Sequence, residues 1–154
     1  QIEHVAVGPR PGAMPSEEYR IRRAAELERI KAARAIQTGA EGWRQQFVWP
    51  AQGRLSGLFG SQRIYRGTPG AYHSGTDIAT GESGTPFVAP ADGVVILAAH
   101  SPFTLLVNEG DRVHQGQVIG RIGATGRATG PHLHWSMKWQ ASRLDPVLFA
   151  GPMR

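Results

Sequence analysis

The stretch GPHLHWSMKW at residues 130–139 constrains the fold more than any other part of the chain. In an extended strand, successive side chains point to opposite faces, so His132, His134 and Ser136 share one face. The other face carries apolar side chains, those of Leu133, Trp135 and Met137. The pattern predicts a strand over His132–Trp139 that buries one face and presents two imidazoles on the other.

A second segment, YHSGTD at residues 72–77, places a histidine and an aspartate four positions apart. Each motif alone is weak evidence, because such pairs are common on surfaces and in turns. Together they could supply two imidazoles and one carboxylate, which can hold a zinc ion and leave one coordination position for water. Such an ion lowers the pKa of its water and polarises a substrate carbonyl. A further histidine that is not a ligand could act as general base or stabilise an oxyanion.

From Phe47 onward, short apolar runs alternate with glycine and proline, which is typical of a chain built from short strands. The whole sequence contains 20 Gly and 11 Pro in 154 residues. Besides His132–Trp139, the runs that we expect to form strands are Arg54–Phe59, Thr85–Ala89, Gly93–Ala98, Thr104–Val107 and Gln117–Ile122. We therefore expect a mostly β fold, a small antiparallel β-sheet domain with an open groove, and one short turn of helix near Pro146–Phe149.

The N-terminal third has a different texture. Residues 1–15 are rich in turn formers and predict a tail or linker. Ser16 can cap a helix that runs to Gln37, with Gly39 as a stop signal. We expect a helical arm at 16–38, a linker at 39–50 and one folded domain at 51–150. The charged helix is either a solvated arm or a basic arm that binds an acidic polymer.

The bulk composition limits the classes of site and partner. The sequence has no Cys, so a metal site must use His, Asp or Glu. Its net charge of +5 favours an anionic partner or simply keeps the protein in solution. No apolar run approaches bilayer length. The chain begins at Gln1, so a targeting segment, a membrane tether or an upstream domain could precede it.

Several motifs together resemble the lysostaphin-like (LytM-type) zinc metallopeptidase family, in the form found in the Gram-negative periplasm. The first half of the resemblance lies in HSGTDIA at 73–79, GTP at 84–86 and APADGVV at 89–95. The second half lies in GDRV at 110–113, GQVIG at 116–120 and GATGRATGPHLHW at 123–135. The resemblance covers residues 47–149.

The resemblance implies a function and a role for individual residues. His73, Asp77 and His134 would be the ligands of Zn²⁺, and His132 would be a catalytic residue beside the metal. The implied reaction is hydrolysis of peptide cross-links in bacterial peptidoglycan by a metal-activated water. The partners would be peptidoglycan stem peptides or cross-bridges, with no nucleic acid, in the periplasm or cell envelope.

The sequence departs from the family between Gly93 and Gly110. Members of the family have a longer stretch there, a β-hairpin that carries another catalytic histidine, and neither His100 nor His114 lies in the corresponding context. Either the hairpin is truly deleted, or residues were lost from the sequence at the abrupt join in Thr104–Val107. The deletion supports an alternative function, a weak or inactive wall-binding module that activates a cell-wall amidase.

Two further features bear on the class of protein. A biotinyl- or lipoyl-type carrier would need a lysine at a hairpin tip, and the sequence has no Lys between Lys31 and Lys138, which excludes that class. The four tryptophans could line a glycan groove, although core packing is the better interpretation for Trp135. They are Trp43, Trp49, Trp135 and Trp139.

Overall fold

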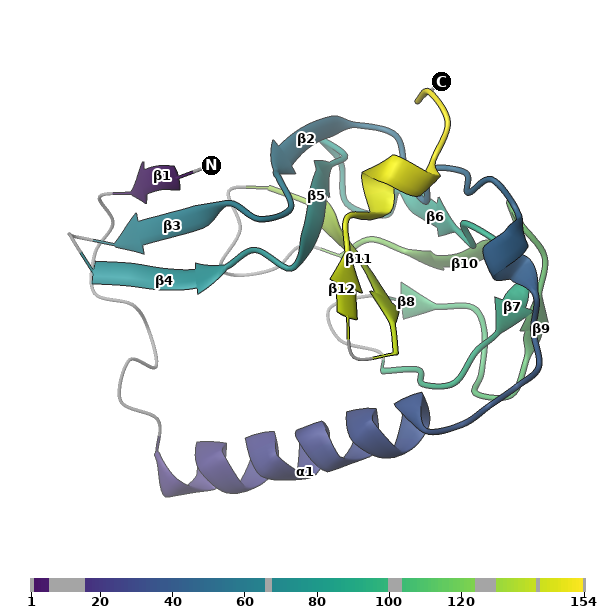
Figure 1. The fold of residues 1–154 in the computed structure, drawn as a ribbon, viewed down its shortest axis with the longest axis horizontal. Coiled ribbons are helices and arrows are strands. Elements are labelled where there is room, and N and C mark those ends of the chain that lie inside the picture. Colours follow the sequence, from purple (N-terminus) through teal and green to yellow (C-terminus); the bar gives the residue numbers. More distant parts are fainter. Residues whose placement is uncertain are drawn as a thin grey trace.

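Within the described residues, the strand with His132 and His134 belongs to an antiparallel sheet of four strands in the order β12–β11–β5–β2 (Figure 1). These strands are β2 (Arg54–Gly57), β5 (Gly75–Ala79), β11 (His132–Trp139) and β12 (Ser142–Leu144). The computed structural model describes residues 2–5, 16–65, 68–99, 104–123, 130–140 and 142–153. Strand β11 has the predicted bounds, and Leu133 and Trp135 on its apolar face are 7% exposed each, as the alternation in the sequence requires.

Three smaller sheets surround the four-stranded sheet. One has the order β6–β10–β8 and a second pairs β7 with β9. Their strands are β6 (Pro86–Val88), β7 (Gly93–Val94), β8 (Thr104–Leu105), β9 (Arg112–Val113) and β10 (Val118–Arg121). The expected strand at Thr104–Val107 is thus shorter than predicted, and it pairs antiparallel with β10. The mostly antiparallel β fold predicted from the sequence is confirmed.

The third small sheet has the order β1–β3–β4 and extends to one side of the domain (Figure 1). It contains β1 (Ile2–Val5), β3 (Gln62–Tyr65) and β4 (Thr68–Tyr72). Strand β1 lies parallel to β3, in a segment that the sequence analysis expects to be a tail or linker. The rest of that segment, 6–15, lies outside the described residues.

The main core fills the space between the four-stranded sheet and the β6–β10–β8 sheet. Its buried members include Ile78, Phe87 and Ile122 together with Leu133 and Trp135 of β11. The indole of Trp49 packs edge-on against that of Trp135, with ring centroids 5.6 Å apart. Burial of these side chains, at about 25 cal/mol per Å² of apolar surface, fixes which face of β11 points inward.

The expected linker at 39–50 is built into the domain. Phe47 forms a bridge to Ala150, and Trp49 Nε1 donates a 2.6 Å hydrogen bond to the carbonyl of Gly151. The short 3₁₀ helix η1 (Gly42–Arg44) precedes this contact. We therefore propose that the folded domain begins at about Gly42, where a Cβ would collide with the Asp92 backbone.

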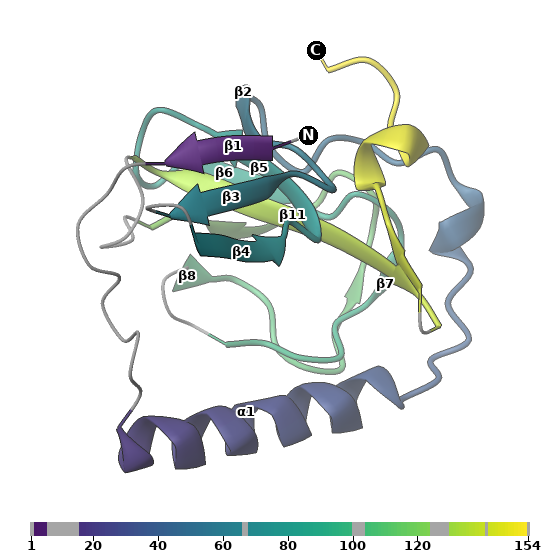
Figure 2. The same cartoon turned by 60° about the vertical axis from the view of Figure 1, so that its left-hand side comes forward.

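The helical arm forms α1 (Glu17–Arg34), shorter by three residues than the prediction. Ser16 caps it as expected, accepting a hydrogen bond from the Tyr19 amide. Figure 2 shows α1 running beside the sheets, and Ala33 is its buried residue. The short helix near the C-terminus is η2 (Pro146–Phe149), at the predicted place. Within the described residues, no helix combines the length and the apolarity that a bilayer span requires.

Candidate metal centre

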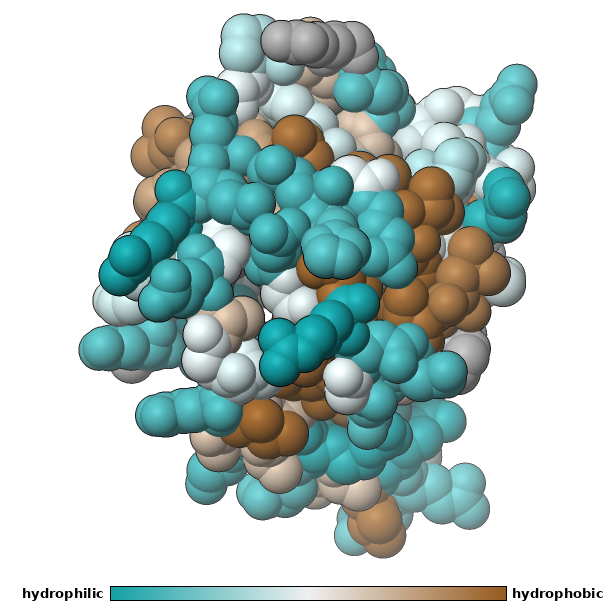
Figure 3. Space-filling view, turned by 90° about the vertical axis from the view of Figure 1, so that its right-hand side faces the viewer, coloured by the Kyte–Doolittle hydropathy of each residue, from teal (hydrophilic) through white to brown (hydrophobic). Residues whose placement is uncertain are grey.

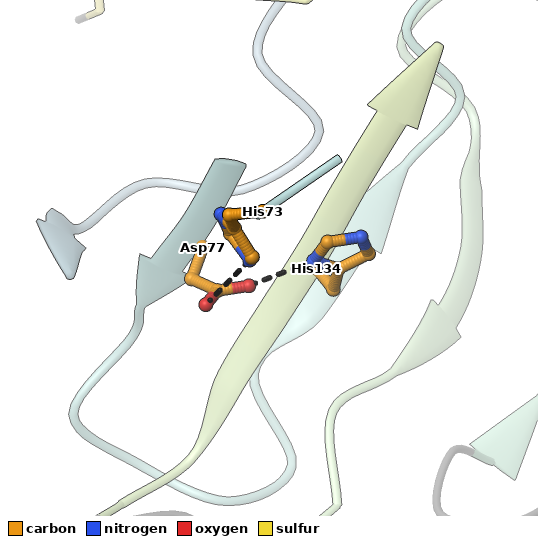
Figure 4. A group of neighbouring side chains, drawn as sticks. All are labelled: His73, Asp77 and His134. Atoms are coloured by element: carbon orange, nitrogen blue, oxygen red, sulfur yellow. Dashed lines mark hydrogen bonds and ion pairs between the residues drawn. The ribbon is translucent and has the colours of Figure 1, made fainter. Parts of the chain in front are cut away.

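Asp77 and His134 lie directly opposite each other in neighbouring strands, β5 and β11. The carboxylate Oδ1 of Asp77 accepts a 2.8 Å hydrogen bond from Nδ1 of His134 (Figure 4). On the other side of β5, Gly57 of β2 pairs with Asp77. The register of these three strands is set by the side chains that the sheet buries. Packing of the core therefore brings the side chains of Asp77 and His134 together.

His73 reaches the same point from the loop between β4 and β5. Its backbone is held by two hydrogen bonds, from its amide to the Ser61 carbonyl at 2.7 Å and from the Gly60 amide to its carbonyl at 2.8 Å. Its ring Nδ1 lies 3.1 Å from the Leu58 carbonyl oxygen, which can only accept. Nδ1 therefore carries the proton, and Nε2 points to Asp77 Oδ2 at 3.2 Å.

The three side chains gather their ligand atoms within 4.8 Å of one another. The two imidazole rings are 5.0 Å apart between centroids and inclined by 70°. All three side chains reach solvent, with exposed fractions of 24% for His73, 14% for Asp77 and 42% for His134. The structure thus brings together the three residues that the sequence analysis proposed as ligands.

The donor set fits a divalent ion such as zinc. Two imidazole nitrogens and one carboxylate make a three-ligand set of the kind found in catalytic zinc sites. The Leu58 carbonyl fixes the tautomer of His73, as outer hydrogen-bond partners of metal ligands commonly do. Without a cation, Nε2 of His73 and Oδ2 of Asp77 at 3.2 Å would need a second proton on the ring to attract each other. A metal ion would replace that proton.

The Asp77 carboxyl stays ionised in this environment. Burial alone would raise its pKa, but the hydrogen bond from His134 and the nearby charges of His73, His134 and His132 outweigh burial and lower the pKa below its ordinary value. The balance favours the carboxylate, which is the form that binds a metal.

Two glycines make room for the cluster. A Cβ on Gly57 would lie 2.7 Å from Asp77 Oδ2 and 3.2 Å from Cε1 of His73. A Cβ on Gly75 would lie 2.5 Å from the Trp135 carbonyl oxygen and 2.9 Å from Nε2 of His134. Sequence reasoning missed the role of both, although glycine inside a strand often marks a close approach.

His132 occupies the same face of β11 as His134 and is partly buried. Its Nδ1 lies 3.2 Å from the Gly130 carbonyl oxygen, so Nδ1 carries the proton and Nε2 is left as an acceptor. His132 is close enough to contribute to the electrostatic field at Asp77. Residues 124–129 and His100 lie outside the described residues, and His114 follows β9.

Comparison with known proteins gives consistent matches. Residues 97–146 match the model of peptidase family M23. A peptidoglycan DD-endopeptidase of Vibrio cholerae, ShyA, is 33% identical over 115 residues, which cover 60% of this chain and 26% of the relative. The chain thus spans about a quarter of the length of the first curated relatives that it matches.

Two solved structures share the fold. A crystal structure from Pseudomonas aeruginosa assigned to peptidase M23 superposes with a TM-score of 0.65 at 31% identity, covering 91% of this chain and 64% of the other. A zinc-containing peptidase from Vibrio cholerae superposes with a TM-score of 0.58 at 25% identity, covering 71% of this chain and 41% of the other.

Proposed function

Because this chain contains a domain of peptidase family M23, we propose that it is a zinc-dependent endopeptidase that hydrolyses the peptide cross-links of bacterial peptidoglycan. The observation that carries the proposal is the convergence of His73, Asp77 and His134, whose ligand atoms lie within 4.8 Å of one another. A purely regulatory module has no need of three converging ligand side chains, so this geometry favours the enzyme over the amidase-activating alternative.

In the proposed site, the ligands are Nε2 of His73, the carboxylate of Asp77 and Nδ1 of His134. When bound, zinc would polarise the scissile carbonyl and activate a water molecule. The backbone of the chain positions the ligands: the Leu58 carbonyl orients His73, and the β5–β11 register orients the other two. The site is thereby ordered before substrate arrives, which reduces the reorganisation needed during the reaction.

The proposed role of His132 is proton transfer at Nε2. The Gly130 carbonyl accepts the Nδ1 proton of this ring, so Nε2 has a free lone pair in the neutral imidazole. A base in this position can take a proton as the attacking oxygen adds to the carbonyl and return it to the departing amine. His132 lies two residues before His134 on the same face of β11, and so beside the proposed ligands. It is not a member of the group formed by His73, Asp77 and His134.

The proposed substrate follows from the relatives and the charge. ShyA is named a peptidoglycan DD-endopeptidase, and peptidoglycan lies in the bacterial cell envelope, which is the location that we propose for this chain. Its stem peptides carry free carboxylates. A net charge of +5 would raise their concentration near the protein at low ionic strength.

The decisive experiment combines metal analysis with product analysis on purified cross-linked muropeptides. We expect the wild-type chain to bind zinc in a 1:1 ratio and to release uncross-linked products, and His134→Ala to lose both properties. The matched control is Ser136→Ala, since Ser136 is exposed on the same face of β11 two residues further on. A wild-type chain that contains zinc and leaves cross-linked muropeptides intact would refute the proposal.

A further inference from the structure

Two tryptophans from distant parts of the chain meet on the protein surface. The rings of Trp43 in η1 and Trp139 at the end of β11 lie 6.0 Å apart between centroids and are inclined by 57°. Trp43 is 55% exposed and Trp139 is 53% exposed. Large aromatic side chains normally stabilise a fold by being buried away from solvent. A surface pair that leaves about half of its area exposed to solvent is therefore available for a ligand.

The two rings form a tilted platform with the Arg44 guanidinium beside it. The guanidinium carbon of Arg44 lies 4.8 Å from the centroid of the Trp43 ring, within the range of a cation–π contact. Arg44 also pairs with the exposed carboxylate of Glu41 at 3.9 Å, and its own side chain is 63% exposed. Lys138 and Arg143, which are register partners in β11 and β12, are also exposed, but the alternation of the strand places them on the face opposite Trp139.

The hairpin turn that presents Trp139 has an unusual backbone. Gln140 has a φ of 51°, a left-handed conformation that non-glycine residues rarely adopt. Such conformations cost on the order of 1 kcal/mol or more and cluster at binding sites. The turn places the exposed amide side chain of Gln140 directly after the exposed indole of Trp139, so an amide lies beside the two aromatic rings.

This platform is separate from the candidate metal centre. Trp139 is five residues beyond His134 on β11, and at about 3.3 Å per residue the two are roughly 16 Å apart along the strand. An odd separation also puts them on opposite faces of the strand. Figure 1 shows η1 as the short blue coil at the right-hand side of the molecule, and Figure 3 shows that side with hydrophilic and hydrophobic residues intermingled.

We propose that Trp43 and Trp139 form a binding site for the glycan strand of peptidoglycan, an inference that rests on the proposed substrate of the metal centre. The apolar C–H face of a pyranose ring stacks on an indole, and its hydroxyl and acetamido groups bond to amides and guanidinium groups. Arg44, whose guanidinium stacks on Trp43, complements the carboxylates of the attached peptides. A polymer held at two places gains avidity of about 10²–10⁴ without any new contact at the reacting bond.

The test measures glycan binding apart from cleavage. The probe is the hexamer of N-acetylglucosamine, a glycan without peptides, titrated into the full chain while tryptophan fluorescence and calorimetric heats are recorded. We expect wild type to bind it and Trp43→Ala/Trp139→Ala to bind at least tenfold more weakly. The matched control, Leu106→Ala, removes an equally exposed apolar side chain (55%) and should bind like wild type.

Further readouts separate this inference from the function of the metal centre. The double variant should sediment less with intact peptidoglycan sacculi, and its kcat/KM on soluble cross-linked muropeptides should stay within about twofold of wild type. Trp139→Phe, which keeps an aromatic ring, should retain most of the binding and also serves if the double variant is unstable. Failure of the hexamer to bind wild type, or equal binding by the double variant, overturns the glycan site whatever the cleavage assay shows. Binding without cleavage would refute the proposed function alone.

Discussion

Asp77 Oδ1 and His134 Nδ1 are joined by a 2.8 Å hydrogen bond, although the two residues are 57 positions apart in the sequence. They meet because Asp77 and His134 are direct partners in the β5–β11 register. On the other side of the carboxylate, His73 Nε2 lies 3.2 Å from Asp77 Oδ2. A metal ion bound by these side chains would displace the proton that His134 Nδ1 donates to Asp77, so metal binding releases a proton.

Replacing His132 separates ligation from proton transfer. We expect His132→Gln to keep the zinc content of wild type and to lower kcat on muropeptides by about 10²–10⁴-fold, because the amide cannot accept and return a proton at the Nε2 position. Zinc content is measured on the same purified samples that are assayed. A variant that loses its zinc would assign His132 to the ligands and remove the basis for its catalytic role.

Replacing Gly57 tests the space around the carboxylate. In Gly57→Ala the new methyl group would lie 2.7 Å from Asp77 Oδ2, so either the carboxylate or β2 must move. Overpacking of this kind costs about 1–3 kcal/mol, and we expect zinc affinity to fall by roughly tenfold or more. The measurement is competition with a chromophoric chelator.

The control for Gly57→Ala is Gly93→Ala. Gly93 also lies in a strand, but nothing approaches its Cβ position within 4 Å. This substitution should leave zinc affinity unchanged. Equal affinities for Gly57→Ala and wild type would show that the carboxylate does not need its observed position to bind metal.

Removing the metal should lower the stability of the fold. A ligand at a thousand times its Kd stabilises the native state by about 4 kcal/mol. For a domain of this size that corresponds to a rise in Tm on the order of 10 °C. We expect chelation to reverse this rise in wild type, as followed by circular dichroism. His134→Ala should show no dependence on added zinc, and a zinc-dependent Tm in that variant would place the ion elsewhere.

We expect the Asp92 carboxylate to stabilise the fold at a place remote from the candidate metal centre. It accepts hydrogen bonds from the Gln45 side chain at 3.1 Å and from the Gln115 amide at 2.7 Å, and so ties η1 to the loop before β10. Asp92→Ala should lower the free energy of unfolding by about 1–3 kcal/mol. Urea denaturation measures it, with the exposed Glu82→Ala as control. Zinc affinity should not change, and a loss of zinc would contradict this local role.

The strand that carries His132 and His134 could be predicted from the sequence because the relevant information is local. The alternation in His132–Trp139 identifies the buried and exposed faces of a strand, and the structure gives that strand the same bounds. The apolar partners Leu133 and Trp135 are buried as expected. The helix start at Ser16 was also predictable, because the cap is a local contact: the Ser16 side chain accepts a hydrogen bond from the backbone amide of Tyr19.

The contributions from distant backbone could not be predicted. The Leu58 carbonyl that orients His73 has no side-chain signature, and the close approach of Gly57 depends on the pairing of β2 with β5. Strands β4 and β5 were missed because their alternation is broken by glycine, proline and threonine, and β3 was missed because its four residues, QRIY, are too short a run to show a pattern. Strand β1 pairs with a segment about 60 residues away, and no local pattern encodes such a partner.

The β5–β11 register also makes correct folding a condition for chemistry. A slip of one residue would turn Asp77 or His134 to the opposite side of the sheet and push an aliphatic side chain into water. A nascent or partly denatured chain therefore carries every histidine and still lacks the converged ligand atoms of the candidate metal centre. Under the proposed function, completion of the sheet would be the step that makes hydrolysis possible, so chains that have not folded correctly would be inactive.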